Sequence, residues 1–170
     1  MEQAPTPLDA ETKVAERPDD HKDELRLWLR IFTCKMVIEG EVRRRLRDAF
    51  GVTLPRFDLM AQLDRAPNAM TLGELSRRMM VTNGNVTGLV DRLVAQRLIE
   101  RRPSPSDRRS QLVSLTAEGR RAFRAMARAN ADWMAEMFAD LSTVESETLL
   151  RLLAKTKKSV RKAIGKEGPP

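Results

Sequence analysis

Residues 71–116 read TLGELSRRMMVTNGNVTGLVDRLVAQRLIERRPSPSDRRSQLVSLT, and this stretch decides the fold. It opens on Thr71, followed three residues later by Glu74, which is the spacing of a capping box at a helix N-terminus. A second cap, Thr82, precedes apolar residues that recur every three or four positions: Val86, Leu89, Val90, Leu93 and Val94. Two capped helices joined by a turn of three or four residues predict a helix-turn-helix.

The second half of this stretch changes from helical to extended patterning. Two short runs, 98–102 and 111–115, flank the turn-rich segment 103–107. Short extended runs on both sides of a loop rich in Pro and Ser predict a β-hairpin. A hairpin directly after a helix-turn-helix is the wing of a winged helix, so we predict a winged helix-turn-helix over 51–116.

Long amphipathic helices are predicted on both sides of this unit. The helix predicted over 21–50 carries two apolar stripes. Another long helix is predicted over about 117–139, and a last one runs through Ile164. A helix that is apolar on two sides has to be covered on two sides, which suits a helix shared with a partner subunit. The predicted fold class is therefore mainly α with a small β-hairpin wing, in which 21–50 and 117–164 form a helical dimerisation region.

Two residues mark the junction between the first two helices. Gly51 ends the first helix, because glycine adopts the left-handed conformation of a helix C-terminus at no steric cost. Pro55 is predicted to occupy the first position of the second helix, where its missing N–H costs nothing.

Composition excludes several classes of protein. The chain has 170 residues, with one cysteine and one histidine. One cysteine excludes a disulfide framework, and one Cys with one His is too small a set for a zinc cage, so we expect no cofactor or metal. The sequence contains no apolar run long enough to span a membrane, and we expect a cytoplasmic protein. It also contains no Gly-rich phosphate loop, paired acid-base carboxylates or Ser/His or Cys/His set, so we expect no enzyme activity.

Charge is distributed unevenly along the chain. The formal net charge is +7 and the sequence pI is about 10.2, which favours an anionic partner. Residues 1–20 carry a net charge of −4, so the remaining chain carries +11. We expect a flexible acidic tail at 1–20, which either keeps the chain soluble or shields the basic surface, and a second flexible end at 165–170. Between Thr71 and Ser110, eight arginines stand against four acidic residues.

The helix that begins after Thr82 has the composition of a DNA-reading helix. A helix that enters the major groove needs short polar side chains near its N-terminus, where asparagine pairs with adenine and the threonine methyl contacts the thymine methyl. Gly84 and Gly88 each lower helix propensity by about 1 kcal/mol, a cost that close approach to DNA explains better than exposure to solvent. The alternative is an ordinary polar, solvated helix face. The predicted contacts in this helix are Thr82, Asn83, Asn85, Thr87 and Arg92.

The hairpin tip is basic. Arg101, Arg102, Arg108 and Arg109 lie within nine positions, with Asp107 among them. Arginine is attracted into a narrow DNA minor groove by its enhanced negative potential, whereas a carboxylate is repelled by phosphate. Asp107 is therefore expected to pair with a neighbouring guanidinium and to preset the loop. The alternative is a solvated charged loop.

These motifs resemble the MarR family of bacterial transcriptional regulators. The pattern Asp107-x-Arg109 followed by Val113-x-Leu115-Thr116 is similar to the wing signature of that family, and the likeness covers about 25–164. The resemblance implies a homodimer whose first and last two helices form the dimerisation part and whose two lobes read a pseudo-palindromic operator in double-stranded DNA. It also implies that Arg109 enters the minor groove, with Arg108 beside it, that Asp107 orients the wing, and that the helix from Thr82 lies in the major groove. The Asn-Gly-Asn opening of that helix is a variation on the family pattern.

A further resemblance concerns the small-molecule effector. Family members usually repress, and many release DNA when an aromatic carboxylate binds between the dimerisation part and the DNA-binding lobe. The stretches LRLWLR (25–30) and LPRFDLM (54–60) resemble a branch that senses aromatic acids or their coenzyme A thioesters in aromatic compound catabolism. Apolar side chains are expected to line such a slot and arginines to receive its anion; the candidates are Arg26, Trp28, Arg30, Phe32, Arg56, Phe57 and Met60. The alternative is that the Met and aromatic stripe belongs to the core.

Two other functions remain open at this point. Cys34 lies in the middle of the predicted first helix, and some family members sense oxidants through a thiol; a buried Cys ordinarily acts as a small hydrophobic residue. An architectural DNA-binding protein without an effector is the second alternative. The polar, mostly uncharged helix face after Thr82 argues against it, because binding to phosphates alone has no use for Asn and Thr at base-edge positions.

Overall fold

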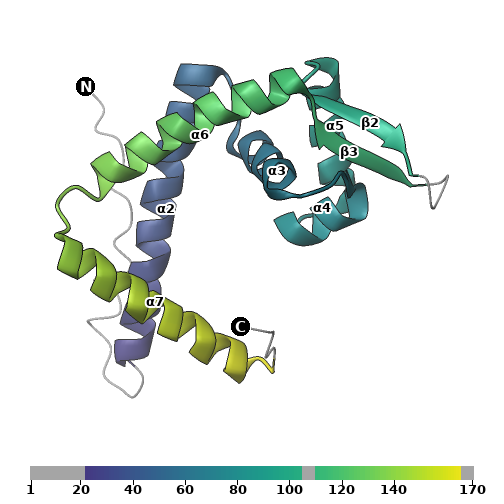
Figure 1. Cartoon of the computed structure of the whole chain (residues 1–170). Coiled ribbons are helices and arrows are strands. Elements are labelled where there is room, and N and C mark those ends of the chain that lie inside the picture. Colours follow the sequence, from purple (N-terminus) through teal and green to yellow (C-terminus); the bar gives the residue numbers. More distant parts are fainter. Residues whose placement is uncertain (1–21, 105–109, 166–170) are drawn as a thin grey trace, which may run out of the picture. The chain divides into compact units, whose positions relative to one another are not determined.

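The computed structural model describes residues 22–104 and 110–165. The pattern of contacts divides the chain into two compact units, Met1–Ala129 and Asn130–Pro170. The boundary falls within helix α6 (Ala117–Met137), which therefore contributes to both units. The elements, numbered as in Figure 1, are α2 (Lys22–Phe50), α3 (Leu54–Arg65), β1 (Met70–Thr71), α4 (Leu72–Met79), α5 (Asn83–Ala95), β2 (Ile99–Pro103), β3 (Gln111–Leu115), α6 (Ala117–Met137) and α7 (Thr143–Ala163).

The core of the first unit lies where α3, α4, α5 and the small sheet meet (Figure 1). α2 contributes Leu46, which has no exposed surface, and Phe57 of α3 packs against Phe123 of α6 with ring centroids 5.5 Å apart. The other fully buried side chains are Leu59, Met60, Leu75, Val86, Val90, Leu93, Ile99, Val113 and Leu115. The apolar stripe predicted for α5 therefore faces this core, where burial of each such side chain contributes about 1.5–3 kcal/mol.

The helix-turn-helix is formed by α4 and α5. The amide of Glu74 donates to Oγ1 of Thr71 (3.2 Å) and the amide of Thr71 donates to the Glu74 carboxylate (2.7 Å), so the predicted capping box is present. α4 ends at Met80, which has the left-handed φ of 55°. The next helix, α5, begins after Thr82, whose Oγ1 accepts from the amide of Asn85 (3.4 Å). Both caps predicted from the sequence are thus confirmed.

The sheet has one strand more than the predicted hairpin. Its order is β1-β3-β2, with both pairs antiparallel. β1 contains only Met70 and Thr71, and Met70, which is 3% exposed, pairs with Val113 at the centre of β3. Two residues are too few to show the alternation that identifies a strand in a sequence, which is why the sequence did not indicate β1.

The sheet is tied to the start of α6 by a tight backbone contact. Oγ1 of Thr116 accepts from the amide of Gly119 (2.9 Å) and donates to the carbonyl of Arg97 (2.8 Å). The amide of Thr116 donates to the carbonyl of Leu98 (3.0 Å). A Cβ atom on Gly119 would lie 1.9 Å from that same carbonyl oxygen, so only glycine fits at this position.

In the second unit, α7 leaves its apolar side chains uncovered. The helix begins after Ser142, which forms a capping box with Glu145. Its apolar residues and the C-cap Ile164 are 42–71% exposed: Val144, Leu149, Leu150, Leu152, Leu153, Val160 and Ile164. An amphipathic helix with this much exposed apolar surface lacks a partner for its apolar stripe.

The predicted fold class is confirmed, and most predicted helix limits lie within two residues of those observed. Gly51 ends α2 with a φ of 63°, as expected. The prediction for Pro55 is wrong by one position, because Thr53 is the N-cap and Leu54 the first residue of α3. The tails predicted at 1–20 and 165–170 lie outside the described residues, except for Gly165.

Candidate nucleic-acid interface

One face of α5 is buried and the opposite face is exposed and polar. Val86, Val90 and Leu93 have no exposed surface. Four of the five residues predicted to contact DNA here are exposed, namely Thr82, Asn83, Asn85 and Arg92. Gly84 and Gly88 are exposed on the same side. The core therefore holds α5 in place on one side while the other side remains available to a partner.

The two threonines predicted as contacts use their hydroxyls within the helix. Thr82 caps α5, so its loss would also cost the helix about 0.5–2 kcal/mol. Thr87, which is half-buried, donates from Oγ1 to the carbonyl of Asn83 (2.9 Å). Because this hydroxyl is engaged, the group that Thr87 offers to a partner is its methyl, which suits a thymine methyl.

A depression of about 370 Å³ lies along the exposed face of α5. Gly84 and Gly88, one helical turn apart, help keep it open, because a Cβ atom on either would meet no atom within 4 Å. Asn85 and Arg92 supply its polar groups, and the rest of its wall is formed by Pro55, Met79, Val81 and Leu89. The missing side chains at Gly84 and Gly88 allow another molecule to approach the helix backbone closely.

The structure describes the base of the wing, residues 99–104 and 110–115. The predicted wing-tip residues Asp107, Arg108 and Arg109 lie outside the described residues. Directly before and after this segment, the amide of Ser104 donates to the carbonyl of Ser110 (2.9 Å). This bond continues the pairing of β2 with β3, so the two strands remain together up to the start of the loop.

The arginines on β2 lie on opposite faces of the sheet. Arg102 pairs with Glu100, whose Oε1 also accepts from the hydroxyl of Ser114 (3.1 Å). On the other face, Nη2 of Arg101 lies 2.6 Å from Oδ1 of Asp91 on α5. The sequence does not indicate this pair, because a contact between side chains in two different elements leaves no periodic signal.

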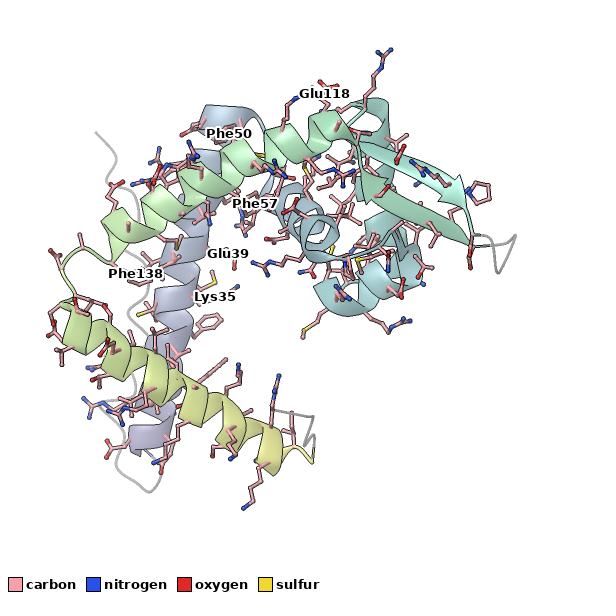
Figure 2. All side chains as sticks on the ribbon, viewed as in Figure 1. Lys35, Glu39, Phe50, Phe57, Glu118 and Phe138 are labelled. Carbon is pink, nitrogen blue, oxygen red and sulfur yellow. The ribbon has the colours of Figure 1, made fainter. Side chains whose placement is uncertain are left out.

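The arginine-rich end of α2 is partly neutralised within its own helix. Lys35 pairs with Glu39, and both are labelled in Figure 2. Arg43 pairs with the same Glu39, while Arg44 and Arg45 pair with Glu41. The hydrogen bonds from Arg44 and Arg45 lower the pKa of Glu41 to about 2. These arginines are therefore less available to an external anion than their number suggests.

The predicted effector residues on α2 are exposed. Trp28 and Phe32 form a tilted aromatic pair with ring centroids 5.8 Å apart, and they are 57% and 44% exposed. Arg30 is exposed on the same helix, and Arg26 is an exposed residue whose guanidinium lies 3.9 Å from the Asp23 carboxylate. These four side chains offer exposed aromatic and cationic surface along α2.

The predicted effector residues on α3 differ among themselves. Met60 has no exposed surface and Phe57 packs on Phe123, so both occupy the core, the alternative that the sequence left open. Arg56 is half-buried, and its Nε is buried without a hydrogen-bond partner among the described residues.

The structure does not bring the α2 and α3 groups together within one chain. Burial, the larger cause, and the charge of Glu39 raise the pKa of Asp58, so this α3 carboxylate lies within electrostatic range of Glu39 on α2. Trp28 lies eleven residues before Glu39, which is about 16 Å along α2. The aromatic pair and Arg56 are therefore two separate surfaces of this chain.

Other kinds of site find little support in the part of the chain that the structure describes. No group of three or more His, Cys, Asp or Glu side chains there is placed to hold a metal ion. None of the described helices has the length and apolar character needed to cross a bilayer. Cys34 is exposed on α2.

The sequence and the fold match known proteins. A profile of the MarR family matches residues 50–110. The transcriptional activatory protein BadR of Rhodopseudomonas palustris is 33% identical over 112 residues, which cover 64% of this chain and 63% of BadR. A MarR family transcriptional regulator from Silicibacter pomeroyi is 33% identical, with a TM-score of 0.65 over 83% of this chain and 99% of that one.

A solved complex connects this fold to DNA. A mutant of the E. coli protein MarR, complexed with operator DNA, is 26% identical, with a TM-score of 0.67 over 81% of this chain and 99% of that one. The winged helix-turn-helix, its exposed polar α5 and these relatives agree on one assignment. The chain belongs to the MarR family of winged-helix DNA-binding transcriptional regulators.

Proposed function

We propose that two copies of this chain bind a pseudo-palindromic operator, with each α5 in a major groove and each wing in an adjacent minor groove. The observation that carries this proposal is the exposed polar face of α5, with its depression beside Gly84 and Gly88. Asn83 and Asn85 are assigned to base edges and Arg92 to a base edge or phosphate. Thr82 and Thr87 complete this face, as helix cap and as methyl contact.

The wing supplies the second set of contacts. We assign Arg109 to the minor groove and Arg108 to a position beside it, with Asp107 orienting the loop through a neighbouring guanidinium. Arg109→Ala should weaken operator binding at least about tenfold, because it removes a charge from the groove with the strongest negative potential. A gel-shift titration measures this effect, and size-exclusion chromatography with light scattering shows whether assembly is unchanged. Unaltered affinity would refute the assignment.

The dimer is supported by uncovered apolar surface outside the winged helix. On α2 the exposed apolar residues include Leu25, Leu27, Trp28, Phe32, Met36 and Val37, which are 44–65% exposed. α7 carries a similar surface. We therefore assign 21–50 and 117–164 to dimerisation and 51–116 to DNA binding. Genomic selection of bound fragments, followed by footprinting, should find two half-sites about 10 base pairs apart, or a multiple of that spacing; a single unpaired half-site would contradict the dimer.

The effector is proposed to be an aromatic acid or its coenzyme A thioester, and its binding is proposed to release the operator. The buried, unbonded Nε of Arg56 offers a donor to an anion, and Trp28 with Phe32 offers an aromatic surface. Arg26 and Arg30 lie near that pair in the sequence and are candidates for additional charge contacts. Because the two surfaces are separate within one chain, an effector that uses both requires a second subunit.

A thermal-shift screen of aromatic acids and their thioesters tests this part of the proposal. A true effector should raise the melting temperature in a concentration-dependent way and lower operator affinity. Arg56→Met should lose the response, whereas Arg65→Met, at the other end of α3, should keep it. The effector assignment fails if no such compound both binds and releases DNA.

The direction of regulation is proposed to be repression through occupancy of a promoter. Activation is the second candidate, favoured by one observation: BadR, the relative that is 33% identical, is described as a transcriptional activatory protein. Transcription in vitro from the selected promoter separates the two. Repression predicts less transcript when the protein is added, and activation predicts more.

Two further alternatives have direct tests. If Cys34 senses oxidants, peroxide should release the wild type from DNA, and Cys34→Ser should prevent the release. If the protein is architectural, bulk DNA should compete as well as the operator does at moderate salt.

A further inference from the structure

An ion pair joins the base of the wing to the recognition helix. Nη2 of Arg101, on β2, lies 2.6 Å from Oδ1 of Asp91, on α5. Nη2 and Nε of Arg101 are both buried, and neither has hydrogen-bond geometry to any acceptor among the described residues. The contact is therefore an ion pair held by the position of the two elements rather than by a directed hydrogen bond.

The sheet directs Arg101 toward α5. Successive side chains of a strand point to opposite faces, so Arg101 shares its face with the buried Ile99, while Arg102 points the other way with Glu100. The Arg101 side chain is 27% exposed and that of Arg102 is 70% exposed. Arg101 therefore covers the edge of the core beside α5, and Arg102 faces solvent.

Asp91 is the only acidic residue of α5. Its side chain is 57% exposed on a helix that we assign to the DNA groove, where an unpaired carboxylate would repel phosphate. Pairing with Arg101 cancels that charge. The same contact fixes the base of the hairpin against the helix, so it acts on both DNA-reading elements at once.

We infer that Arg101 is a positioning residue for DNA recognition, which sets the wing against α5 through Asp91 and does not itself contact phosphate. This inference rests on the proposed function, because it concerns how two DNA-reading elements are held in register. It separates Arg101 from Arg108 and Arg109, which we assign to direct DNA contact. It also gives Asp91 a favourable role on a DNA-facing helix.

Asp91→Asn tests the inference by the sign of its effect. Removing a negative charge near DNA should tighten binding if Asp91 only repels phosphate. The inference predicts the opposite, a loss of operator affinity of about tenfold, which is the scale of coupling between neighbouring charges.

Variants of Arg101 complete the test. Arg101→Met should cause a similar loss, and Arg101→Lys should retain part of the affinity. The double variant, Asp91→Asn with Arg101→Met, should be no weaker than either single variant. Tighter binding by Asp91→Asn, or losses that simply multiply in the double variant, would overturn the inference.

Salt dependence separates positioning from phosphate contact. Each phosphate contact contributes about 0.9 to the slope of log affinity against log salt. Arg101→Met should leave that slope unchanged, whereas the control Arg102→Met, on the opposite face of the same strand, should reduce it if Arg102 meets phosphate. A slope reduced by Arg101→Met would show that Arg101 contacts phosphate.

Hydrogen exchange in the DNA-free protein gives an independent result. Both Asp91→Asn and Arg101→Met should speed exchange of the β2 amides, because the hairpin loses its link to α5. Unchanged β2 exchange in both variants would overturn the inference even if no operator were found. If instead exchange rises but the wild type shows no preference for any DNA sequence, the proposed function fails while the structural link stands.

Discussion

Gly84 and Gly88 are the residues whose chemistry distinguishes α5 from an ordinary surface helix. Glycine inside a helix is unfavourable, and neither position has a neighbour within 4 Å that would exclude a methyl group. Folding therefore gives no reason for glycine at either site. Close approach of another molecule to the backbone does, and the depression beside them is where that approach can occur.

Gly88→Ala should stabilise the protein and weaken DNA binding. The free energy of unfolding should rise by about 1 kcal/mol through helix propensity, while the added methyl enters the depression and lowers operator affinity. Urea unfolding and a gel-shift titration measure the two effects. The matched control is Gly40→Ala in α2, also exposed and also without a neighbour within 4 Å, which should raise stability alone. Unchanged DNA affinity of Gly88→Ala would contradict the close approach.

At Gly119, in contrast to Gly84 and Gly88, the fold itself requires glycine. A Cβ atom there would overlap the carbonyl oxygen of Leu98 at 1.9 Å, so Gly119→Ala has to displace the start of α6 from the sheet. We expect the free energy of unfolding to decrease by about 1–3 kcal/mol, which is the usual cost of overpacking. A melting temperature equal to that of the wild type would show that the junction between the sheet and α6 can accommodate the added methyl group without loss of stability.

At the scale of elements, capped and periodic helices could be predicted from the sequence and tertiary contacts could not. Thr71, Glu74 and Thr82 act through neighbours three residues away, so their caps are visible in the sequence. β1 is too short to show a pattern, and the Arg101–Asp91 pair depends on how two elements pack. Among the proposed effector residues, the sequence could not separate the buried Met60 from the exposed Trp28, because both follow helical spacing.

The carboxylates of α2 and of the helix caps predict how stability changes with pH. Ion pairs and capping hydrogen bonds hold the pKa of Glu39, Glu41, Glu74 and Glu145 below the ordinary value of 4.5, and that of Glu41 falls to about 2. Because these pKa values are lower in the folded state, the stability they provide is present above pH 4.5 and is lost as pH falls toward 2. The raised pKa of Asp58 acts in the opposite direction.

The melting temperature, measured from pH 7 to pH 3, should therefore begin to decrease once the pH is below about 4.5. Glu41→Gln should make that fall shallower, since it removes the carboxylate with the lowest pKa. Parallel pH profiles for the wild type and this variant would show that the Arg44–Glu41–Arg45 network contributes no pH-dependent stability.

For the whole molecule, the winged helix and the terminal helices differ in how much apolar surface they expose. Positive charge is present on both parts, because eight arginines stand against four acids over 71–110 and six basic residues stand against two acids on α7. Most of the exposed large apolar side chains of the described residues lie on α2 and α7, whereas the winged helix exposes Met80 and Val81. This distribution fits a protein that binds DNA with its winged helix and a second copy of itself with its terminal helices.

Leu153→Glu should therefore disrupt the dimer, because it places a carboxylate in the proposed apolar interface. Light scattering should give twice the chain mass of 19.3 kDa for the wild type and a lower mass for the variant. Lys155→Glu, an exposed change on the opposite face of α7, is the control and should remain dimeric. A wild type of single-chain mass would contradict the dimer.

The central claim is that the exposed face of α5 reads base edges, and the most direct measurement is operator affinity against a panel of single base-pair substitutions. For the wild type, each substitution at a contacted position should cost about 1–3 kcal/mol. For Asn85→Ala, the penalty should vanish at one position in each half-site and remain at the others. If the variant instead bound every operator more weakly by the same factor, Asn85 would be a phosphate contact and the claim would be contradicted.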